Sequence, residues 1–186
     1  MFRNVFRVIV LGTFVGFALA ADRPAATRKP AEPPEAIDNI DTKKIDPDHI
    51  ALLKKTLGGT GESRADGHVF VLTLPRTDLD LHSIDFGDVP VEAGVETSLR
   101  FFRCGCGKYY VLGEFCVTDY ESADVIDSLV RGQMRIASVA PMMLGDKPRI
   151  VLIRFQAEGE IDALNKTLAD AMRWVGENRS KPQPAK

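Results

Sequence analysis

Two sulfur-containing motifs are the part of this sequence whose residue types could best do chemistry. Cys104-Gly-Cys106 and Met142-Met143 would together offer the soft ligands that bind Cu(I). The cysteine pair alone could instead close a disulfide within one tight turn and act as a redox motif. No Cys-x-x-Cys motif and no following helix N-terminus accompanies the pair. The pattern therefore favours structural or incidental cysteines, and Cys104 and Cys106 stay as the only candidate metal ligands.

The histidines and carboxylates show no spacing that is typical of a catalytic or metal site. No two of His49, His68 and His82 lie within five positions, so no metal-binding His pair exists on a helix or a strand. No Gly-x-Ser-x-Gly motif occurs, and the glycine-rich stretch 58–61 follows a helix rather than preceding one. The aspartates within 78–88 lack EF-hand spacing and fit an edge strand better. The sequence therefore indicates no catalytic residue and no cofactor.

The apolar pattern predicts strands and helices over residues 46–176. Asp46 and Pro47 begin a short amphipathic helix that ends at Gly58. Thr118 and Glu121 have capping-box spacing ahead of a second helix, which Gly132 ends. A last helix is predicted over 160–175, and strands are predicted over 68–74, 97–103, 108–117, 134–140 and 149–155, with a short edge strand or an irregular excursion over 79–91.

These elements predict one α+β domain with a mainly antiparallel sheet and helices on one face. From residue 109 onward the order strand, helix, strand, strand, helix has the spacing of a ferredoxin-like fold. In that topology the loops 104–107 and 141–147 lie at opposite ends of the sheet, roughly 20 Å apart, which argues against a joint copper site. Cys116 lies near the far end of its strand, too far from the other two cysteines to bridge them, and we expect it to be buried and reduced.

The first twenty residues have the features of an export signal. Arg3 and Arg7 precede an apolar run over 8–17, and Ala18-Leu19-Ala20 is a small-x-small cleavage site. The apolar run is too short to span a bilayer, and Ala21 rather than a cysteine follows the cleavage site. We therefore expect a signal peptide over 1–20, a secreted chain that is periplasmic or extracellular, and no stable membrane anchor.

The composition of the chain argues against two classes of partner, nucleic acid and anionic lipid. The proline-rich stretch 21–45 predicts an extended linker, and 177–186 a disordered tail. Removal of Arg3 and Arg7 changes the formal net charge from −2 to −4. This mild acidity and the lack of a basic cluster argue against nucleic acid and against anionic lipid as partners. Three cysteines in an oxidising compartment leave at least one unpaired within the chain.

Three segments carry a resemblance that extends over residues 48–175. They are Gly67-His-Val-Phe-Val-Leu-Thr-Leu-Pro-Arg-Thr-Asp-Leu79, Leu112-Gly-Glu-Phe115 and Leu144-Gly-Asp-Lys-Pro-Arg-Ile150. Together they resemble the LppY/LpqO-like family of bacterial exported proteins, a domain family with no assigned biochemical function. The Pro-Arg-x-Asp-Leu and Gly-x-x-Pro-Arg pieces are the more specific ones.

The resemblance also implies a His-Asn-His segment just before the Gly-x-x-Pro-Arg piece. Counted back from Pro148, its positions are occupied here by Ala140, Pro141 and Met142. An alanine neither accepts a proton nor binds a metal, and a thioether binds only soft ions. Any chemistry that depends on the two histidines should therefore be missing from this chain.

The acidic residue and the arginine of the family pattern correspond to Glu114 and Arg76. In the predicted topology Arg76, Glu114, Cys116 and Met142 lie toward one end of the sheet and form a candidate pocket. The alternative is a cluster with a purely structural role.

Two functions remain open. The first is a small exported binding or interaction domain without catalytic activity, for an unknown small ligand or protein partner. The second is a metal-dependent protein or an enzyme that uses the Arg76/Glu114 end of the sheet. The sequence favours the first and leaves open whether the protein is an enzyme.

Overall fold

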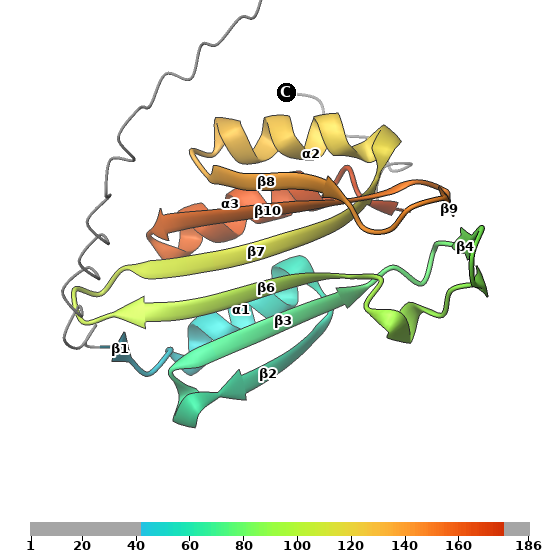
Figure 1. Cartoon of the computed structure of the whole chain (residues 1–186). Helices are drawn as coiled ribbons and strands as arrows, with labels where there is room; N and C mark the ends of the chain where they lie inside the picture. Colours follow the sequence, from blue (N-terminus) through green and yellow to red (C-terminus); the bar gives the residue numbers. More distant parts are fainter. Residues whose placement is uncertain (1–41, 177–186) are drawn as a thin grey trace, which may run out of the picture. The chain divides into compact units, whose positions relative to one another are not determined.

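The computed structural model describes residues 42–176 (Figure 1). The signal expected over 1–20, the tail expected over 177–186 and all but the last four residues of the linker expected over 21–45 lie outside this range. Every paired strand in the main sheet is antiparallel to its neighbour. The predicted α+β class with a mainly antiparallel sheet is thereby confirmed. The strand order is β2 (Thr60–Arg64), β3 (Val69–Pro75), β6 (Glu96–Cys104), β7 (Tyr109–Thr118), β10 (Ile150–Gly159) and β8 (Arg135–Pro141), and β1 (Thr42–Lys43) pairs with β6.

The C-terminal half has the predicted ferredoxin-like arrangement. β7 leads through α2 (Asp119–Arg131) to β8, and β10 lies between the two strands. Because β10 is antiparallel to both, β7 and β8 run in the same direction. The last helix, α3 (Ile161–Met172), begins one residue later and ends three residues earlier than the sequence predicted.

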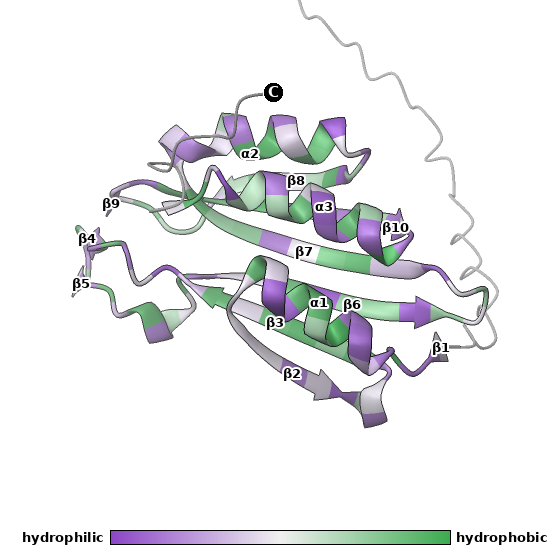
Figure 2. Ribbon diagram, turned by 180° about the vertical axis from the view of Figure 1, so that it is seen from behind, coloured by the Kyte–Doolittle hydropathy of each residue, from purple (hydrophilic) through white to green (hydrophobic). Residues whose placement is uncertain are grey.

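The first two helices begin where the sequence predicts. In α1 (Pro47–Leu57) the Asp46 carboxylate caps the first turn by accepting from the Asp48 N–H at 3.0 Å. In α2 the capping box of Thr118 and Glu121 is present, since the Thr118 N–H donates to Glu121 Oε2 at 2.7 Å. Figure 2 shows all three helices against the same side of the main sheet.

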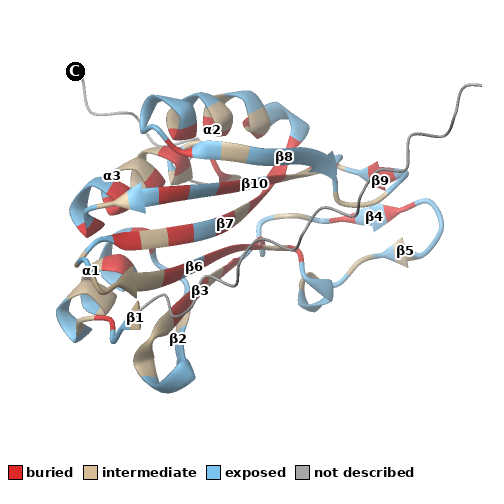
Figure 3. Ribbon diagram, turned by 60° about the vertical axis from the view of Figure 1, so that its left-hand side comes forward, coloured by how far each residue is buried: buried red, intermediate tan, exposed pale blue. Residues whose placement is uncertain are grey.

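The main hydrophobic core lies between these helices and the sheet (Figure 3). Alternate residues of each strand point into it, as the period of two requires. Leu72, Leu99 and Gly113 are neighbours across three strands on this face, and the Phe155 ring covers the place where a side chain at residue 113 would stand. The remaining large residues of this core that are fully buried are Leu53, Phe70, Phe101, Tyr109, Phe115, Leu129, Ile153 and Leu168.

A second, smaller apolar cluster lies elsewhere in the fold. Leu81 and Val95, from the segment between β3 and β6, pack there with Cys116 and Ile150. The same segment contributes β4 (His82–Ser83) and β5 (Gly87–Asp88) to a three-stranded sheet, completed by β9 (Asp146–Lys147). The excursion expected over 79–91 is therefore an ordered sheet of short strands at one end of the domain (Figure 1).

The structure differs from the sequence prediction at the start of the domain and at β2. The linker expected over 21–45 does not include its last residues, because Thr42–Lys43 pair with β6 and Ile45 is buried in the main core. β2 was not predicted, since Thr60-Gly-Glu-Ser-Arg64 has no apolar residue to mark a strand. Within residues 42–176, no helix has the length and apolar character needed to cross a membrane.

Candidate functional site

Arg76 occupies the most highly connected polar position of the candidate pocket. Its side chain is only 4% exposed and uses all five N–H donors. Two of these bonds go to the Asp78 carboxylate at 2.8 and 2.9 Å, and two go to the Glu121 carboxylate at 2.9 and 3.1 Å. The fifth goes to the Cys116 carbonyl at 2.8 Å. No donor of this guanidinium remains for a ligand.

The acidic partners of Arg76 join separate parts of the chain. Glu121 also accepts from the backbone N–H of Thr118 and, at 2.6 Å, from that of Gly176. Burial opposes the charge of Arg76, but the bonds to Asp78 and Glu121 outweigh it and raise the pKa of Arg76 above its ordinary value. The same bonds lower the pKa of Asp78 below its ordinary 3.8, against the effect of burial. We call Arg76, Asp78 and Glu121 the ionic clamp. Its hydrogen bonds connect the segment after β3 with the first turn of α2, and Glu121 also connects to Gly176 in the segment after α3.

Cys116 and Met142 lie in the second apolar cluster rather than beside an open pocket. Cys116 is fully buried, and Leu81, Val95 and Ile150 share its cluster, with Met142 packed at the side. Cys116 is a free thiol, as predicted. Desolvation raises the pKa of Cys116 to about 11, against the lowering effect of Arg76, so the thiol is neutral and unreactive at neutral pH.

Glu114 is separated from the ionic clamp. It lies nearer the start of β7 than Cys116 does, where it is paired with Ser98 of β6 on one side and with Arg154 of β10 on the other. Its carboxylate accepts from Arg154 Nε, and the two side chains are 26% and 62% exposed. The structure thus brings Arg76 and Cys116 into contact and puts Met142 in the same cluster as Cys116, but places Glu114 in a separate surface ion pair.

The segment expected to hold two histidines lies at the outer edge of the sheet. Ala140 and Pro141 are exposed on β8, opposite Leu152 and Val151 of β10. A shallow hollow of about 270 Å³ borders them and includes Asp119 and Arg149. No imidazole occupies these positions, so the proton or metal chemistry of a His pair has no counterpart there.

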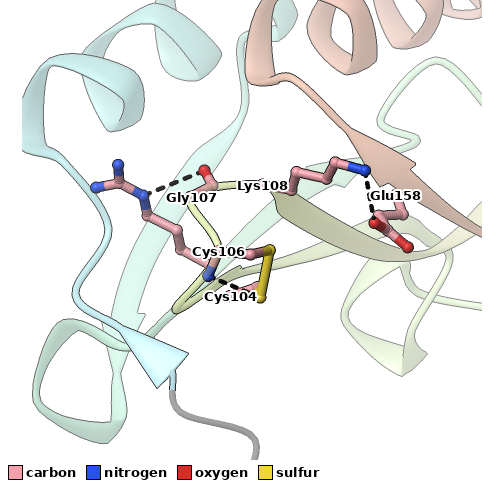
Figure 4. The surroundings of a disulfide bond; sticks show 6 residues. Cys104, Cys106, Gly107, Lys108 and Glu158 are labelled. Atoms are coloured by element: carbon pink, nitrogen blue, oxygen red, sulfur yellow. Dashed lines mark hydrogen bonds and ion pairs between the residues drawn. A yellow bond between two sulfur atoms is a disulfide. The ribbon is translucent and has the colours of Figure 1, made fainter.

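The hairpin loop between β6 and β7 carries a disulfide between Cys104 and Cys106 (Figure 4). This resolves the alternatives left open by the sequence, because bonded sulfurs are not thiolate ligands for a metal. The loop and the Met142-Met143 segment also lie at opposite ends of β7, since Tyr109 pairs with Gly159 and Thr118 with Ile150. No group of three or more His, Cys, Asp or Glu residues with the geometry to hold a metal occurs within residues 42–176.

The disulfide contributes little to the stability of the fold. It closes a ring of only three residues, and the chain-entropy relation gives about 1.6 kcal/mol for such a ring, against about 3 kcal/mol for a fifteen-residue ring. The β6–β7 ladder holds the same hairpin through six paired positions, from Ser98 with Glu114 to Arg103 with Tyr109. The cross-link is therefore not needed to form this turn.

The tip of the small sheet is the most apolar exposed part of the described structure. Ile84, Phe86 and Leu144 are 70%, 78% and 79% exposed. Ile84 donates its N–H to the Gly145 carbonyl at 3.1 Å, which places the hairpin residue directly beside the strand that follows Leu144. We call these three side chains the apolar tip.

A family model described as a Domain of Unknown Function (DUF1259) matches residues 51–174. The match covers 174 − 51 + 1 = 124 of the 186 residues. The chain belongs to this family. No curated protein and no solved structure matches the chain.

The ionic clamp, the disulfide and the apolar tip all lie inside the part that the DUF1259 model matches, apart from the contact with Gly176. Sequence reasoning gave no site role to Asp78 and Glu121 of the ionic clamp or to any of the three residues of the apolar tip. Glu121 was assigned only to helix capping, although its carboxylate also binds Arg76. Leu144 was assigned only to a motif and a connecting loop, and because Met142 and Met143 precede it, nothing in the sequence distinguishes it as a surface anchor.

Proposed function

We propose that this chain is an exported binding domain that docks a protein partner through the apolar tip, a surface that itself carries no catalytic group. The single observation that carries the proposal is the gathering of three exposed large apolar side chains on one ordered projection. Such groups are usual at interaction sites and unusual together on a free surface. The signal-like residues 1–20 support export, and the motif segments support a place among LppY/LpqO-like proteins within the DUF1259 family.

The backbone of the tip is organised before any partner binds. β4 pairs with β5 on one side and with β9 on the other, so the turn that carries Ile84 and Phe86 is held from both sides. A preorganised anchor loses less conformational entropy on binding than a mobile loop does. The tip is therefore suited to insertion into a pocket of a partner.

Charges around the tip indicate the chemistry of that partner. Asp85 is exposed in the turn, Asp88 is exposed on β5 beside His82, and Lys147 is the exposed cation of β9. This acidic surround disfavours an anionic membrane surface and fits a protein that presents an apolar pocket bordered by basic side chains.

The three side chains of the apolar tip allow a rough estimate of the binding free energy. Burying three such side chains contributes about 4 to 8 kcal/mol, whereas association costs about 4 to 15 kcal/mol before any contact is made. The anchors alone therefore give a weak complex, and each one is essential to it. Truncating Phe86 should weaken binding by tenfold or more.

A photo-crosslinking amino acid at position 86, in the chain expressed by an exporting bacterium, tests the proposal. We expect it to crosslink to one defined protein, whereas the same group at Val130 on α2, 54% exposed, should not. The crosslinked protein is then purified, and its dissociation constant is measured for the unmodified chain, Phe86→Ala, Leu144→Ser and the control Val130→Ser. Equal binding by all four chains, or identical crosslinks from both positions, would overturn the proposal.

The alternative of an enzyme at the Arg76/Glu114 end has no observation in its favour. The donors of Arg76 are all used within the ionic clamp, and Glu114 pairs with Arg154 on another part of the sheet. A catalytic pair needs at least one group free to meet a substrate.

A further inference from the structure

The disulfide loop has a backbone that holds its shape without the sulfur bond. The Cys104 N–H donates to the Lys108 carbonyl at 2.9 Å, and the Gly107 N–H donates to the Cys104 carbonyl at 2.9 Å. Both bonds close the same turn that the disulfide spans. Breaking the S–S bond therefore leaves a formed hairpin, so the pair can be reduced while the domain stays folded.

One sulfur of the pair is open to attack from solvent. Cys106 is exposed, and the residues on either side of it are Gly105 and Gly107. Gly107 has φ +95, a left-handed conformation that directs the chain back toward β7. Because neither neighbour has a side chain, nothing on the loop itself shields the Cys106 sulfur from an incoming thiolate.

The other sulfur is placed to leave as a thiolate. The Cys106 backbone N–H donates to Cys104 Sγ at 3.0 Å (Figure 4). A hydrogen bond to sulfur favours the charged form of a thiol, and a stabilised thiolate is the better leaving group in disulfide exchange. The two neighbouring cations are engaged elsewhere, since Arg103 donates to the Gly107 carbonyl and Lys108 pairs with Glu158, so the bond from the Cys106 N–H is what distinguishes the two sulfurs. The two sulfurs thus have different roles.

A mainly apolar hollow borders Cys104 and extends across the strands to Arg135 of β8 and Gln156 of β10. It has a volume of about 490 Å³ and includes Cys104, Phe102, Tyr110 and Leu112 in its lining. The rings of Phe102 and Tyr110 stack with centroids 5.2 Å apart. A hollow of this size accommodates several side chains of an extended peptide. Since the one reactive group on its border is a disulfide, the occupant that fits it carries a thiol beside apolar residues.

We infer that Cys104 and Cys106 form a thiol–disulfide exchange site whose substrates are cysteine-containing segments of other proteins. A substrate thiolate attacks Cys106 Sγ; the S–S bond breaks, its electron pair stays on Cys104, and a mixed disulfide forms between Cys106 and the substrate. A second substrate thiolate then attacks the substrate sulfur of that mixed disulfide and releases Cys106 as a thiolate. The substrate dithiol is oxidised to a disulfide, and the protein disulfide is reduced to a dithiol.

The balance of the cycle needs one further reactant class. The reduced pair takes up the two protons that the substrate thiols released. A low-molecular-weight disulfide, such as oxidised glutathione, reoxidises the pair by the same exchange in reverse and becomes two thiols. In the presence of such a disulfide the site turns over many times.

The first test measures exchange by the mature chain. A synthetic peptide with two cysteines, each beside an aromatic residue, is oxidised in a glutathione buffer with and without the protein. We expect the protein to accelerate disulfide formation in the peptide at least tenfold, and the variants Cys104→Ser, Cys106→Ser and Cys104→Ser/Cys106→Ser to lose the acceleration. In Cys104→Ser, oxidised glutathione should trap a stable mixed disulfide at Cys106, which mass spectrometry detects as one added glutathione.

Matched controls separate exchange from a structural role. Cys116→Ala removes the buried thiol and should keep the full acceleration of peptide oxidation. Ile84→Ser, which changes the apolar tip at the other end of the domain, should keep it as well. The melting temperature of Cys104→Ser/Cys106→Ser should stay within about 5 °C of the unmodified chain. The inference would be overturned if Cys104 and Cys106 stayed oxidised at every ratio of reduced to oxidised glutathione. It would also be overturned if the unmodified chain oxidised the peptide no faster than Cys104→Ser/Cys106→Ser does.

The hollow is tested by a change that leaves both cysteines in place. Leu112→Ser should slow exchange with the aromatic peptide at least fivefold and leave the rate with glutathione alone unchanged. Val139→Ser, at a similarly exposed apolar residue on β8 that does not line the hollow, is the control. Equal effects on peptide and glutathione would refute the assignment of the hollow to the substrate.

Discussion

Replacement of Arg76 by methionine should be among the most damaging single substitutions in this domain. The side chain lies at the centre of the ionic clamp, with five hydrogen bonds to Asp78, Glu121 and the Cys116 carbonyl. Methionine fills much of the same volume but offers no donor. Arg76→Met therefore leaves the carboxylate of Glu121, 7% exposed, without its cation.

The cost follows from the burial of the pair. Removing one partner of a buried ion pair lowers the free energy of unfolding by about 3 to 5 kcal/mol, because the other charge stays buried and unpaired. Solvent screening does not reduce this figure, since the Arg76 and Glu121 side chains are only 4% and 7% exposed. For a domain of this size the loss corresponds to a fall in melting temperature of about 10 to 15 °C.

Urea unfolding measures the effect directly. Trp174, the one tryptophan, packs against the main core and reports the transition by its fluorescence. Arg64→Met is the matched control, because its ion pair with Glu62 is 57% and 64% exposed and should change the unfolding free energy by less than about 0.5 kcal/mol. Arg76→Lys should give an intermediate loss, since it keeps the charge but not the forked geometry. If Arg76→Met came within 1 kcal/mol of Arg64→Met, the clamp would not hold the fold together.

Three further predictions rest on single positions. Cys116, whose pKa is raised to about 11, should react with a thiol reagent at neutral pH only as fast as the domain unfolds; rapid stoichiometric labelling of the native protein would contradict its burial. Asp78, whose pKa lies below its ordinary 3.8 in the folded state, stabilises the fold fully above that value and loses this contribution as the pH falls through the lower, folded pKa. The stability advantage over Asp78→Asn should therefore be constant above about pH 5 and shrink below about pH 4, and an advantage that grows on acidification would refute the assignment. Gly113→Ala should cost about 1 to 3 kcal/mol because the new methyl group meets the Phe155 ring; Gly159→Ala, whose methyl group would meet only Leu164 at 3.7 Å, is the control and should cost less than half as much.

The helices and the strand order of the C-terminal half could be predicted because local signals and periodicity agree there. Asp46 with Pro47, and Thr118 with Glu121, mark helix starts by side-chain chemistry that acts within four residues. β2 offers no such signal. Its residues are polar and it is held by its ladder with β3, so its existence depends on a neighbour rather than on its own composition.

The sites could be predicted less well than the elements, because each depends on residues that meet only in three dimensions. Arg76 and Glu121 lie 45 positions apart, and the spacing of Thr118 and Glu121 predicts only the local capping role, which Glu121 also has. Ile84 and Leu144 lie on separate segments that the pairing of β4 with β9 brings together. Glu114 shares a strand with Cys116, but its side chain pairs across to β10 rather than toward the clamp.

The motif segments that carry the resemblance hold the structure together. Arg76 and Asp78 belong to the ionic clamp. Leu79 packs on the second apolar cluster. Asp146 is buried and accepts from the Ile150 N–H at 2.7 Å, which fixes the turn before β10. Removing Arg76 or Asp146 leaves a buried partner unpaired, and truncating Leu79 removes apolar contacts from the second cluster, so these groups stabilise the fold.

Two of the three positions where the resemblance fails, Ala140 and Pro141, lie outside that set, whereas Met142 packs against the second apolar cluster. Ala140 and Pro141 are exposed at the edge of the sheet, and substitutions there leave no buried group unpaired. A side chain at position 140 therefore contributes little to the stability of the fold. Restoring histidine at position 140 should accordingly change the unfolding free energy by less than about 0.5 kcal/mol. If urea unfolding of Ala140→His gave a larger loss of unfolding free energy, this edge of the sheet would also contribute to stability, and the reasoning would be wrong.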